Sequence, residues 1–369
     1  MNIAMLGHKR IPSREGGVEA VVEELATRVV KLGHNVTVYN RKGNNVQDKS
    51  IKTEKVKEYK GVKIKQTFTF QNKTLNAIVY SIIASFKCLF HNYDVIHYHA
   101  EGPCSMIWLP HFFGKRTVAT IHGLDWKRSK WGGFATRFLK FGEKMAVKYA
   151  DEIIVLSEET QKYFEKEYNR KTNYIPNGVN MPKNINANII KKKWGLENDS
   201  YILFLGRIVP EKGIHYLIDA YNQIDTNKKL VIAGGASHTN EYFNEISKKV
   251  KNNKNIIMTG FVQGEILDEL YSNCYLYCLP SDLEGMPLSL LEAMSYGANT
   301  LTSDIPECTQ ITENYGSTFK KGNVNDLKNK LEEILEGKNR KEREEISKYV
   351  LDKYNWDDIA LETIKLYKG

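Results

Sequence analysis

Two glutamates separated by seven residues are the first candidates for chemistry in this sequence. Glu284 and Glu292 lie in the stretch SDLEGMPLSLLEAMSYG, residues 281–297, on either side of a glycine and a proline. Proline favours the first turn of a helix, and LSLLEAMSYG has apolar residues at helical spacing, so a helix is predicted to start near Pro287. Glu284 then lies in the loop before the helix, and Glu292 lies one to two turns inside it.

The start of this predicted helix suits an anion. The unpaired amides of Gly285 to Leu288 would point toward a ligand at the positive end of the helix dipole. Two carboxylates that touched a phosphate would repel it, so we expect each to accept hydrogen bonds from hydroxyls on either side. A sugar nucleotide has hydroxyls in both places, on its ribose and on its sugar. The alternative is that acids at a helix N-terminus only complement the dipole, which explains Glu284 fairly well and Glu292 poorly.

Two cations form the second candidate group. Arg207 and Lys212 in FLGRIVPEKG follow a predicted buried strand and precede a helix that begins after Gly213. Arginine offers a planar fork and lysine a point charge, and together these groups suit a diphosphate. On spacing alone, two ordinary surface cations are an equally good interpretation.

Alternating strands and helices are predicted to position these residues. The first forty residues read as one βαβ unit, with strand NIAMLG, a helix over residues 18–32 and strand NVTVYN. The segment YIPNGVNMPKN, residues 174–184, breaks the periodicity, and the alternation restarts at YILFLG. We therefore predict an α/β protein with two doubly wound, Rossmann-like domains facing a central cleft. Neither GxGxxG nor GxxxxGK[ST] occurs, so neither NAD nor a P-loop nucleotide is predicted.

Composition limits the class of protein. Of the 369 residues, 41% are hydrophobic and 26% charged, which is typical of a globular protein. The apolar window over residues 75–86 is too short to span a bilayer, and the N-terminus lacks the pattern of an export signal. Five cysteines without paired CxxC spacing favour buried thiols in a reducing cytosol over metal ligands or disulfides. A cytoplasmic location follows as an expectation.

Positive charge is concentrated in the first half. Residues 1–180 hold 29 lysines and arginines against 17 acids, and the remainder holds 24 against 27. The segment over residues 126–150 also mixes tryptophan and phenylalanine with lysine and arginine. An anionic membrane surface at the inner face of the membrane would suit such a segment. A core-facing aromatic stripe with a solvated basic back is an equally good interpretation.

These motifs together resemble the retaining GT-B glycosyltransferases of family 4. EGMPLSLLEAMSYG resembles the two-glutamate signature of that family, GRIVPEKG its diphosphate loop, REGGVE its N-terminal glycine loop, IPNGVN its linker and TIHG its strand-end histidine. The motifs occur in order through nearly the whole chain. The resemblance implies an acceptor-side domain over residues 1–178, completed by a crossing helix over 354–369, and a nucleotide-sugar-binding domain over 179–353.

The resemblance also implies roles for individual residues. Arg207 and Lys212 would hold the donor diphosphate, Glu292 would bind the ribose hydroxyls and Glu284 the donor sugar. Further donor contacts would come from Gly16 and Gly17 near the distal phosphate, from Val262 at the base, and from Gly285, Met286, Pro287 and Leu288 along the sugar and phosphate.

The same resemblance implies the reaction centre. His122 in TIHG would face the donor sugar, beside Glu284. Asp125, three residues later, would orient an acceptor hydroxyl, although a loop aspartate that caps the next turn is at least as good an interpretation. The family retains anomeric configuration without an established protein nucleophile, and the leaving phosphate helps to deprotonate the acceptor. No metal or other cofactor is expected, because Arg207, Lys212 and helix amides would neutralise the leaving group.

The expected function is therefore transfer of a hexose from a nucleotide-sugar donor, with UDP as the default base, to a glycan or lipid-linked acceptor in cell-surface polysaccharide assembly. The motif DLE at residues 282–284 looks like a carboxylate metal motif of the other glycosyltransferase fold, but it lies in the wrong architecture. Two alternatives stay open. One is a sugar-nucleotide enzyme of the same fold, such as a 2-epimerase. The other is a basic nucleic-acid-binding protein, which would leave the two glutamates unexplained, so no nucleic acid partner is expected.

Overall fold

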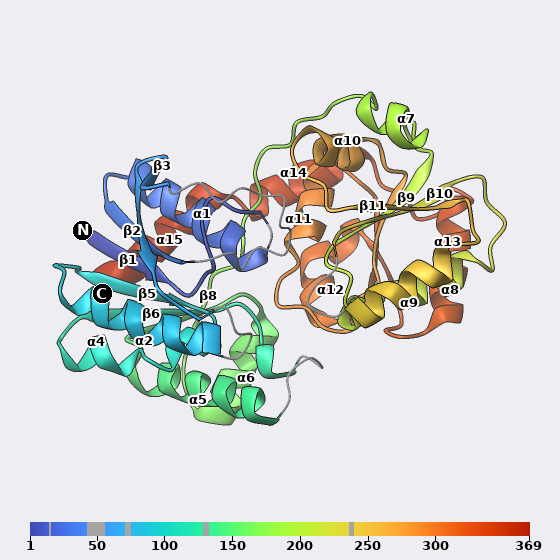
Figure 1. Ribbon diagram of the computed structural model, residues 1–369. Helices are drawn as coiled ribbons and strands as arrows, with labels where there is room; N and C mark the ends of the chain where they lie inside the picture. Colours follow the sequence, from blue (N-terminus) through green and yellow to red (C-terminus); the bar gives the residue numbers. More distant parts are fainter. Residues whose placement is uncertain (15, 43–55, 71–74, 128–132, 236–239) are drawn as a thin grey trace. The chain divides into compact units, whose positions relative to one another are not determined.

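A computed structural model of the chain describes residues 1–14, 16–42, 56–70, 75–127, 133–235 and 240–369 (Figure 1). The chain divides into two compact units. The N-terminal unit comprises Met1–Asn177 and Trp356–Gly369, and the C-terminal unit comprises Gly178–Asn355. The division lies within the segment IPNGVN, where the sequence loses its periodic pattern.

The N-terminal unit is built on a sheet whose strands follow the order β3-β4-β2-β1-β5-β6-β7-β8. The pairings between these strands are parallel except for β3 with β4, which form an antiparallel hairpin. Chain order reverses between β1 and β5, which makes this pair the switch point of the sheet. The strands are β1 (Asn2–Leu6), β2 (Asn35–Arg41), β3 (Glu58–Tyr59), β4 (Val62–Thr67), β5 (Val95–His99), β6 (Arg116–Ile121), β7 (Glu152–Val155) and β8 (Asn173–Tyr174).

Helices cover this sheet. Its first helix, α1, packs against α15, the last helix of the chain, and Arg28 Nε donates to Asp357 at 2.8 Å between them. The helices α2, α3, α4 and α5 pack against one another in a second group. The helices are α1 (Gly17–Lys31), α2 (Leu75–Leu89), α3 (Glu101–Cys104), α4 (Trp108–Phe112), α5 (Gly133–Tyr149), α6 (Glu158–Tyr168) and α15 (Trp356–Lys368), with a short 3-10 turn η1 (Asp125–Lys127).

The C-terminal unit has a second sheet, in the order β11-β10-β9-β12-β13-β14, with parallel pairings throughout the described strands. This is the strand order 3-2-1-4-5-6 of a doubly wound nucleotide-binding sheet, with its switch point between β9 and β12. The strands are β9 (Tyr201–Leu205), β10 (Lys229–Ala233), β11 (Ile256–Gly260), β12 (Leu276–Leu279), β13 (Thr300–Ser303) and β14 (Ser317–Phe319).

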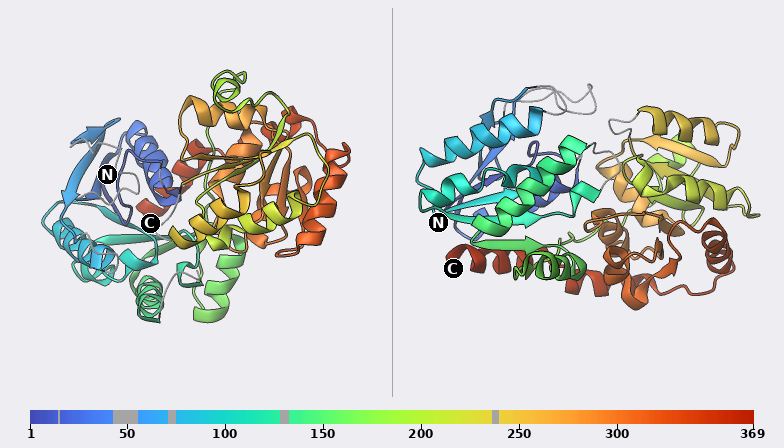
Figure 2. Two further views of the ribbon diagram at one scale, coloured as in Figure 1. Left: turned by 45° about the vertical axis from the view of Figure 1, so that its right-hand side comes forward. Right: turned by 90° about the horizontal axis from the view of Figure 1, so that it is seen from below.

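The helices of the C-terminal unit follow its strands along the chain, and Figure 2 shows helices around both sheets. Helix α8 packs against α13, and α11 packs against α14. The helices are α7 (Ile189–Trp194), α8 (Ile214–Tyr221), α9 (Asn240–Val250), α10 (Glu265–Asn273), α11 (Leu288–Ser295), α12 (Pro306–Thr312), α13 (Val324–Leu335) and α14 (Arg343–Lys353), with 3-10 turns η2 (Pro210–Lys212) and η3 (Glu313–Tyr315).

The structure confirms the predicted α/β class with two parallel, Rossmann-like sheets. The strands predicted at NIAMLG, NVTVYN and YILFLG are β1, β2 and β9. The apolar window over residues 75–86 falls in α2, and none of the helices in the described ranges is long and apolar enough to cross a membrane. All five cysteines are buried thiols without a disulfide, as the spacing predicted.

Candidate functional site

The predicted cations and the first glutamate meet at the switch point of the C-terminal sheet. Strands β9 and β12 are adjacent, with Tyr277 paired to Leu203. The loops that follow both strands therefore leave the same edge of the sheet side by side. One loop carries Arg207 and Lys212 over residues 206–213, and the other carries Glu284 over residues 280–287. Ligands of doubly wound sheets bind at this edge.

A glycine allows the two loops to touch. Gly213 has φ +63°, and a Cβ atom on it would lie 1.9 Å from the carbonyl oxygen of Pro280. Any other residue at this position would have to push the loops apart or adopt a strained backbone. The amide of Asp282 also donates to the carbonyl of Glu211 at 2.9 Å. The backbone thus fixes the distance between the loop with the cations and the loop with the carboxylate.

Lys212 and Glu284 bind each other across these loops. Lys212 Nζ lies 2.6 Å from Glu284 Oε1, and Ser281 Oγ donates to the same oxygen at 2.6 Å. The side chains are 14% and 8% exposed, so the pair is largely removed from water. The sequence predicted a phosphate as the partner of Lys212 and a sugar hydroxyl as the partner of Glu284, and it did not predict that the two would pair. Each largely buried side chain thus has the other as its counter-charge.

Helix α11 carries the second glutamate. The helix begins at Leu288, one residue after the predicted start at Pro287. Glu292 lies one turn inside it and accepts a hydrogen bond from the hydroxyl of Tyr271 at 3.0 Å. Burial, together with Glu292, holds the pKa of Tyr271 well above its usual value, so the phenol stays a donor. No sequence pattern predicted this tyrosine, which lies on α10.

The other donor candidates of the C-terminal unit follow strands of its sheet or precede α11. Arg207 is half-buried at the start of the loop after β9. Val262 is also half-buried, but it follows β11, which lies two strands away from β9. Between the glutamates, Met286 and Pro287 are buried whereas Gly285 and Leu288 are partly exposed.

A histidine stack supports His122 in the N-terminal unit. His122 follows β6, and its Nε2 lies 3.1 Å from Nδ1 of His99 at the end of β5. The ring of His99 stacks on that of His97, with centroids 4.1 Å apart. Burial lowers the pKa of His97 to about 3 and holds that of His99 well below its usual value, so both rings are neutral. The spacing HYH, with two histidines on one face of a strand, was a signal for this stack.

Burial decides which nitrogen of this pair carries the proton. His99 Nε2 is buried and has no hydrogen-bond partner among the described residues. A buried N–H group without an acceptor is rarer in proteins than an unfilled acceptor. The proton of His99 therefore sits on Nδ1 and is donated to His122 Nε2. It follows that His122 carries its own proton on Nδ1.

The two predicted glycines begin α1. Gly17 is the first residue of the helix and Gly16 precedes it. The carboxylate of Glu19 lies beside Gly16, 2.2 Å from the position of an added Cβ, and it accepts a hydrogen bond from the amide of Lys9 at 2.8 Å. A ligand at this turn would therefore approach a backbone that already has a carboxylate on one side.

Asp125 begins the 3-10 turn after His122 and is half-buried. Its amide donates to the carbonyl of Gly123 at 2.9 Å. The adjacent Trp126 donates its indole N–H to Glu143 Oε2 at 3.0 Å. Glu143 lies on α5, next to a second buried glutamate, Glu101, at the start of α3. No sequence motif predicted either of these acids.

The basic, aromatic segment forms an exposed stripe on α5. Residues 128–132, which include Arg128, Lys130 and Trp131, lie outside the described residues. On the rest of the segment, Leu139, Gly142, Glu143 and Ala146 face inward. The outward positions at helical spacing are Phe134, Arg137, Phe141, Lys144 and Lys148. Phe134 is 67% exposed and Phe141 47% exposed, so two of the aromatic side chains share one face with cations instead of packing in the core.

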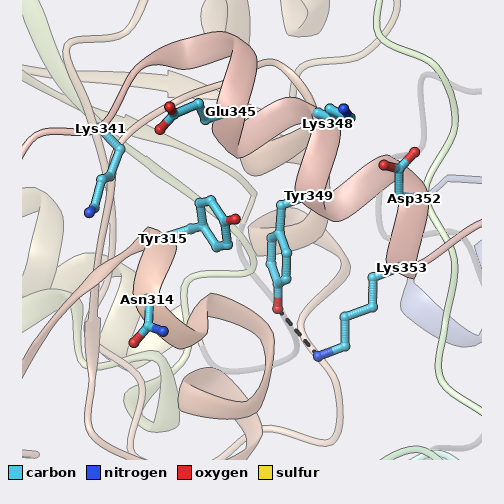
Figure 3. Close-up of a pocket in the computed structure, with 8 residues that line it drawn as sticks. All are labelled: Asn314, Tyr315, Lys341, Glu345, Lys348, Tyr349, Asp352 and Lys353. Carbon is cyan, nitrogen blue, oxygen red and sulfur yellow. Dashed lines mark hydrogen bonds between the residues drawn. The ribbon is translucent and has the colours of Figure 1, made fainter.

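A pocket of about 750 Å³ lies elsewhere in the C-terminal unit (Figure 3). Tyr315 and Tyr349 stack there with centroids 4.2 Å apart, and Lys353 Nζ donates to the hydroxyl of Tyr349 at 3.3 Å. None of the candidate residues described above lines it. Glu345 and Asp352 offset part of the positive charge of its lysines. The volume of this pocket alone is therefore not sufficient evidence for a second ligand site.

Comparisons with known proteins agree with this geometry. The family model described as "Glycosyl transferases group 1" matches residues 186–359, and the one described as "Glycosyltransferase Family 4" matches residues 15–182. An uncharacterized glycosyltransferase of Methanocaldococcus jannaschii is 27% identical over 364 residues, covering 96% of this chain and 94% of that protein.

Two further similarities concern characterised proteins. The Escherichia coli UDP-Gal:alpha-D-GlcNAc-diphosphoundecaprenol alpha-1,3-galactosyltransferase is 29% identical over 241 residues, 61% of this chain and 62% of that enzyme. The solved structure of sucrose-phosphate synthase from Thermosynechococcus elongatus matches with a TM-score of 0.81 at 20% identity, covering 100% of this chain and 98% of that one. The structural likeness shows a shared fold.

Proposed function

The chain belongs to the family 4 glycosyltransferases of GT-B fold, and from this membership we propose that it transfers a hexose from a UDP-sugar to a glycan or lipid-linked acceptor, with retention of anomeric configuration. The observation that carries the proposal is the Lys212–Glu284 pair at the switch point of the C-terminal sheet. This position is where a doubly wound sheet binds nucleotides, and the pair combines a cation for phosphate with a carboxylate for hydroxyls.

Donor binding would proceed by exchange of partners. The donor diphosphate would take Lys212 and Arg207, and Glu284 would then accept a hydrogen bond from a sugar hydroxyl in place of the ammonium group. The partly exposed backbone at Gly285 and Leu288 would add amides at the positive end of α11. Glu292, oriented by Tyr271, would bind the ribose. The name of the similar Escherichia coli enzyme includes the donor UDP-Gal, which supports UDP as the base.

Catalysis would rest on the leaving group. The bond between the sugar C1 and the diphosphate oxygen breaks while the acceptor oxygen bonds to C1 from the same face, and the acceptor proton passes to the departing phosphate. Lys212, Arg207 and the α11 amides would stabilise the charge that develops on the diphosphate. His122 would donate a hydrogen bond through Nδ1–H, which its pairing with His99 favours. We propose that this set suffices without a metal ion.

Acceptor binding would occur at an anionic membrane surface of the cytoplasmic face, in assembly of a cell-surface polysaccharide. The exposed stripe of Phe134, Arg137, Phe141, Lys144 and Lys148 supports this, because aromatic groups and cations together favour anionic lipid. The similar Escherichia coli enzyme carries a diphosphoundecaprenol acceptor in its name, which supports a lipid-linked acceptor.

A two-stage assay tests the proposal. Thermal shifts with UDP, dTDP, GDP and their sugars identify the donor, because a bound ligand raises the melting temperature by mass action. The selected donor is then mixed with lipid-linked acceptors, with and without EDTA, and NMR reports the anomeric configuration of the product. Nucleoside diphosphate released only with acceptor, and with retention, supports transfer. Conversion of the donor to an epimer without any acceptor would support a 2-epimerase instead.

Vesicle binding tests the membrane proposal. Sedimentation with vesicles of anionic and of neutral lipid should show preference for the anionic vesicles. Phe134→Ser with Phe141→Ser should weaken this binding several-fold. Leu361→Ser is the matched control, since Leu361 is 46% exposed on α15 and lies outside the stripe. Equal loss in the control, or equal binding to neutral vesicles, would contradict the proposal.

A further inference from the structure

A buried glutamate in the N-terminal unit has no counter-charge. Glu101 begins α3, directly after β5, and is 0% exposed. Among the described residues, neither of its carboxyl oxygens has a side-chain donor, and the backbone amide of Trp126 is the donor beside them. A carboxylate in such a place would lose most of its hydration with little compensation, which is one of the most costly arrangements in a protein.

Close packing of α5 puts a second glutamate beside it. A Cβ atom on Gly142 would lie 2.0 Å from the carbonyl oxygen of Glu101, so only glycine lets α5 approach α3 this closely. The next residue on α5 is Glu143, also 0% exposed. Two buried carboxyl groups are thereby held next to each other, with Asp125 as a third nearby acid.

The side-chain donors in this region surround Glu143. Its Oε1 accepts from Lys140 Nζ at 3.1 Å, from the hydroxyl of Tyr163 at 2.9 Å and from the hydroxyl of Tyr168. Its Oε2 accepts from the indole of Trp126 at 3.0 Å. These donors stabilise a negative charge on Glu143, and Lys140 forms its salt bridge with Glu143. Glu101 has the anion as a neighbour and no cation of its own.

A proton on Glu101 would remove its unpaired buried charge. A protonated Glu101 could donate a hydrogen bond to the neighbouring Glu143, and the two acids would then share one proton. Burial, with Asp125 and then Glu143 as further causes, raises the pKa of Glu101 to about 10. A bound cation would be the other way to neutralise the pair. No group of three or more His, Cys, Asp or Glu in the described ranges could hold a metal ion.

We propose that Glu101 is a positioning residue for transfer, which as a neutral acid shares a proton with Glu143 and so holds the turn over residues 122–127 in place. The chain of contacts runs from Glu101 to Glu143 and through the Trp126 indole to the turn that carries His122 and Asp125. An ionised Glu101 would repel both Glu143 and Asp125 and loosen this turn. The proposal rests on the proposed function for its effect on activity, but not for the state of the proton.

The tyrosines and the thiol near Glu101 stay protonated over the neutral range. Burial raises the pKa values of Tyr163 and Tyr168 on α6 and of Cys104 on α3, so these groups remain protonated. Lys140 on α5 is bound to Glu143, and Asp125 contributes from the turn after β6. The folded-state pKa of Glu101 lies above its ordinary value of 4.5, so its stabilising effect is complete below that pH and is lost progressively up to about pH 10.

Melting temperatures against pH test the proton. Glu101→Gln keeps a hydrogen-bond donor and cannot ionise, so its melting temperature relative to the wild type should rise steadily from about pH 5 to about pH 9. Glu165→Gln, at an exposed position on α6, is the control and should follow the wild type at every pH. A constant difference between Glu101→Gln and the wild type over this range would overturn the proposal.

Activity and an NMR signal test the positioning. Glu101→Ala and Glu101→Asp should lower kcat about 10- to 100-fold, because a small displacement of a reacting group has effects of this size. Glu101→Gln should rescue most of this loss. The indole N–H signal of Trp126 is assigned by its absence from the spectrum of Trp126→Phe. Its chemical shift should change in Glu101→Ala and should remain that of the wild type in Glu101→Gln.

Binding of the donor separates this proposal from the proposed function. UDP affinity, measured by calorimetry, should be the same in the wild type, Glu101→Ala and Glu101→Gln, because Arg207, Lys212 and Glu292, which are proposed to bind the diphosphate and the ribose, lie in the C-terminal unit. A Glu101→Ala variant with wild-type kcat and an unchanged indole signal would overturn the positioning role. If the wild type itself transferred no sugar, the proposed function would fail, while the melting and indole results would still decide the shared proton.

Discussion

Each unit places a glutamate after a strand that pairs with the first strand of its sheet, and the two glutamates have different surroundings. Glu284 lies in the loop after β12, which pairs with the first strand of the C-terminal sheet, and Glu101 follows β5, which pairs with the first strand of the N-terminal sheet. Glu284 has Lys212 and Ser281 as partners. Glu101 has no side-chain donor among the described residues, and burial raises its pKa to about 10. The position of a glutamate in the sheet therefore does not decide its role. The presence or absence of a neighbouring cation does.

The source of the difference is the loop after the first strand. In the C-terminal unit, this loop carries Lys212 toward the neighbouring loop. In the N-terminal unit, the corresponding loop is bound to α1, since Arg14 pairs with Glu24 and the amide of Ser13 donates to Glu23. Those glutamates are buried on α1. Arg14 thus neutralises acids of its own helix, and Glu101 has no salt-bridge partner among the described residues.

Among the variants that test this difference between the two units, removal of Lys212 should have the largest effect on stability and activity. Lys212→Ala leaves Glu284 buried without its cation, as Glu101 already is, and should lower the free energy of unfolding by about 3–5 kcal/mol. Transfer should be abolished, because the diphosphate loses its nearest ammonium group. Urea denaturation and a transfer assay measure the two effects.

A double variant separates stability from chemistry. Lys212→Met with Glu284→Gln removes both charges and should recover most of the lost stability, because no unpaired charge is left in the site. Activity should not return. A double variant as unstable as Lys212→Ala would mean that the pair does not stabilise the loops as described.

Disruption of the histidine stack should have an intermediate effect. His99→Phe removes the donor to His122 Nε2 and should lower kcat/KM by about tenfold, the cost of one hydrogen bond of about 1.4 kcal/mol. His99→Asn places an amide N–H near the position of Nδ1 and should keep more activity. Nitrogen-15 NMR of His122 reports its tautomer in each variant. Unchanged protonation of His122 Nδ1 in His99→Phe would contradict the assignment.

The smallest effect is expected for the tyrosine that orients Glu292. Tyr271→Phe removes one hydrogen bond to the carboxylate and should weaken UDP binding by about 0.5–1.5 kcal/mol, with the fold intact. Glu292→Ala removes the ribose contact itself and should weaken binding by about 1–3 kcal/mol. Calorimetry with both variants measures the difference. A larger loss in Tyr271→Phe than in Glu292→Ala would show that the tyrosine binds the ligand directly.

The sequence predicted the site residues that lie in loops at the ends of strands. It did not predict the residues that only packing brings together. Arg207, Lys212 and Glu284 follow predicted strands, so their common edge could be foreseen from the α/β alternation. The Lys212–Glu284 pair could not, because it depends on how closely Gly213 lets two loops approach. Glu101 and Glu143 lie 42 positions apart and meet only because Gly142 fits against α3. No local pattern encodes such a contact.

The most direct test measures whether Lys212 leaves Glu284 and binds the donor phosphate. Calorimetry with UDP, or with whichever nucleoside diphosphate gives the largest thermal shift, compares the wild type with Glu284→Gln and Lys212→Met. The account predicts that Glu284→Gln binds several-fold more tightly than the wild type, since Lys212 no longer has to leave a carboxylate, and that Lys212→Met binds at least tenfold more weakly. Equal affinity in all three proteins would contradict it.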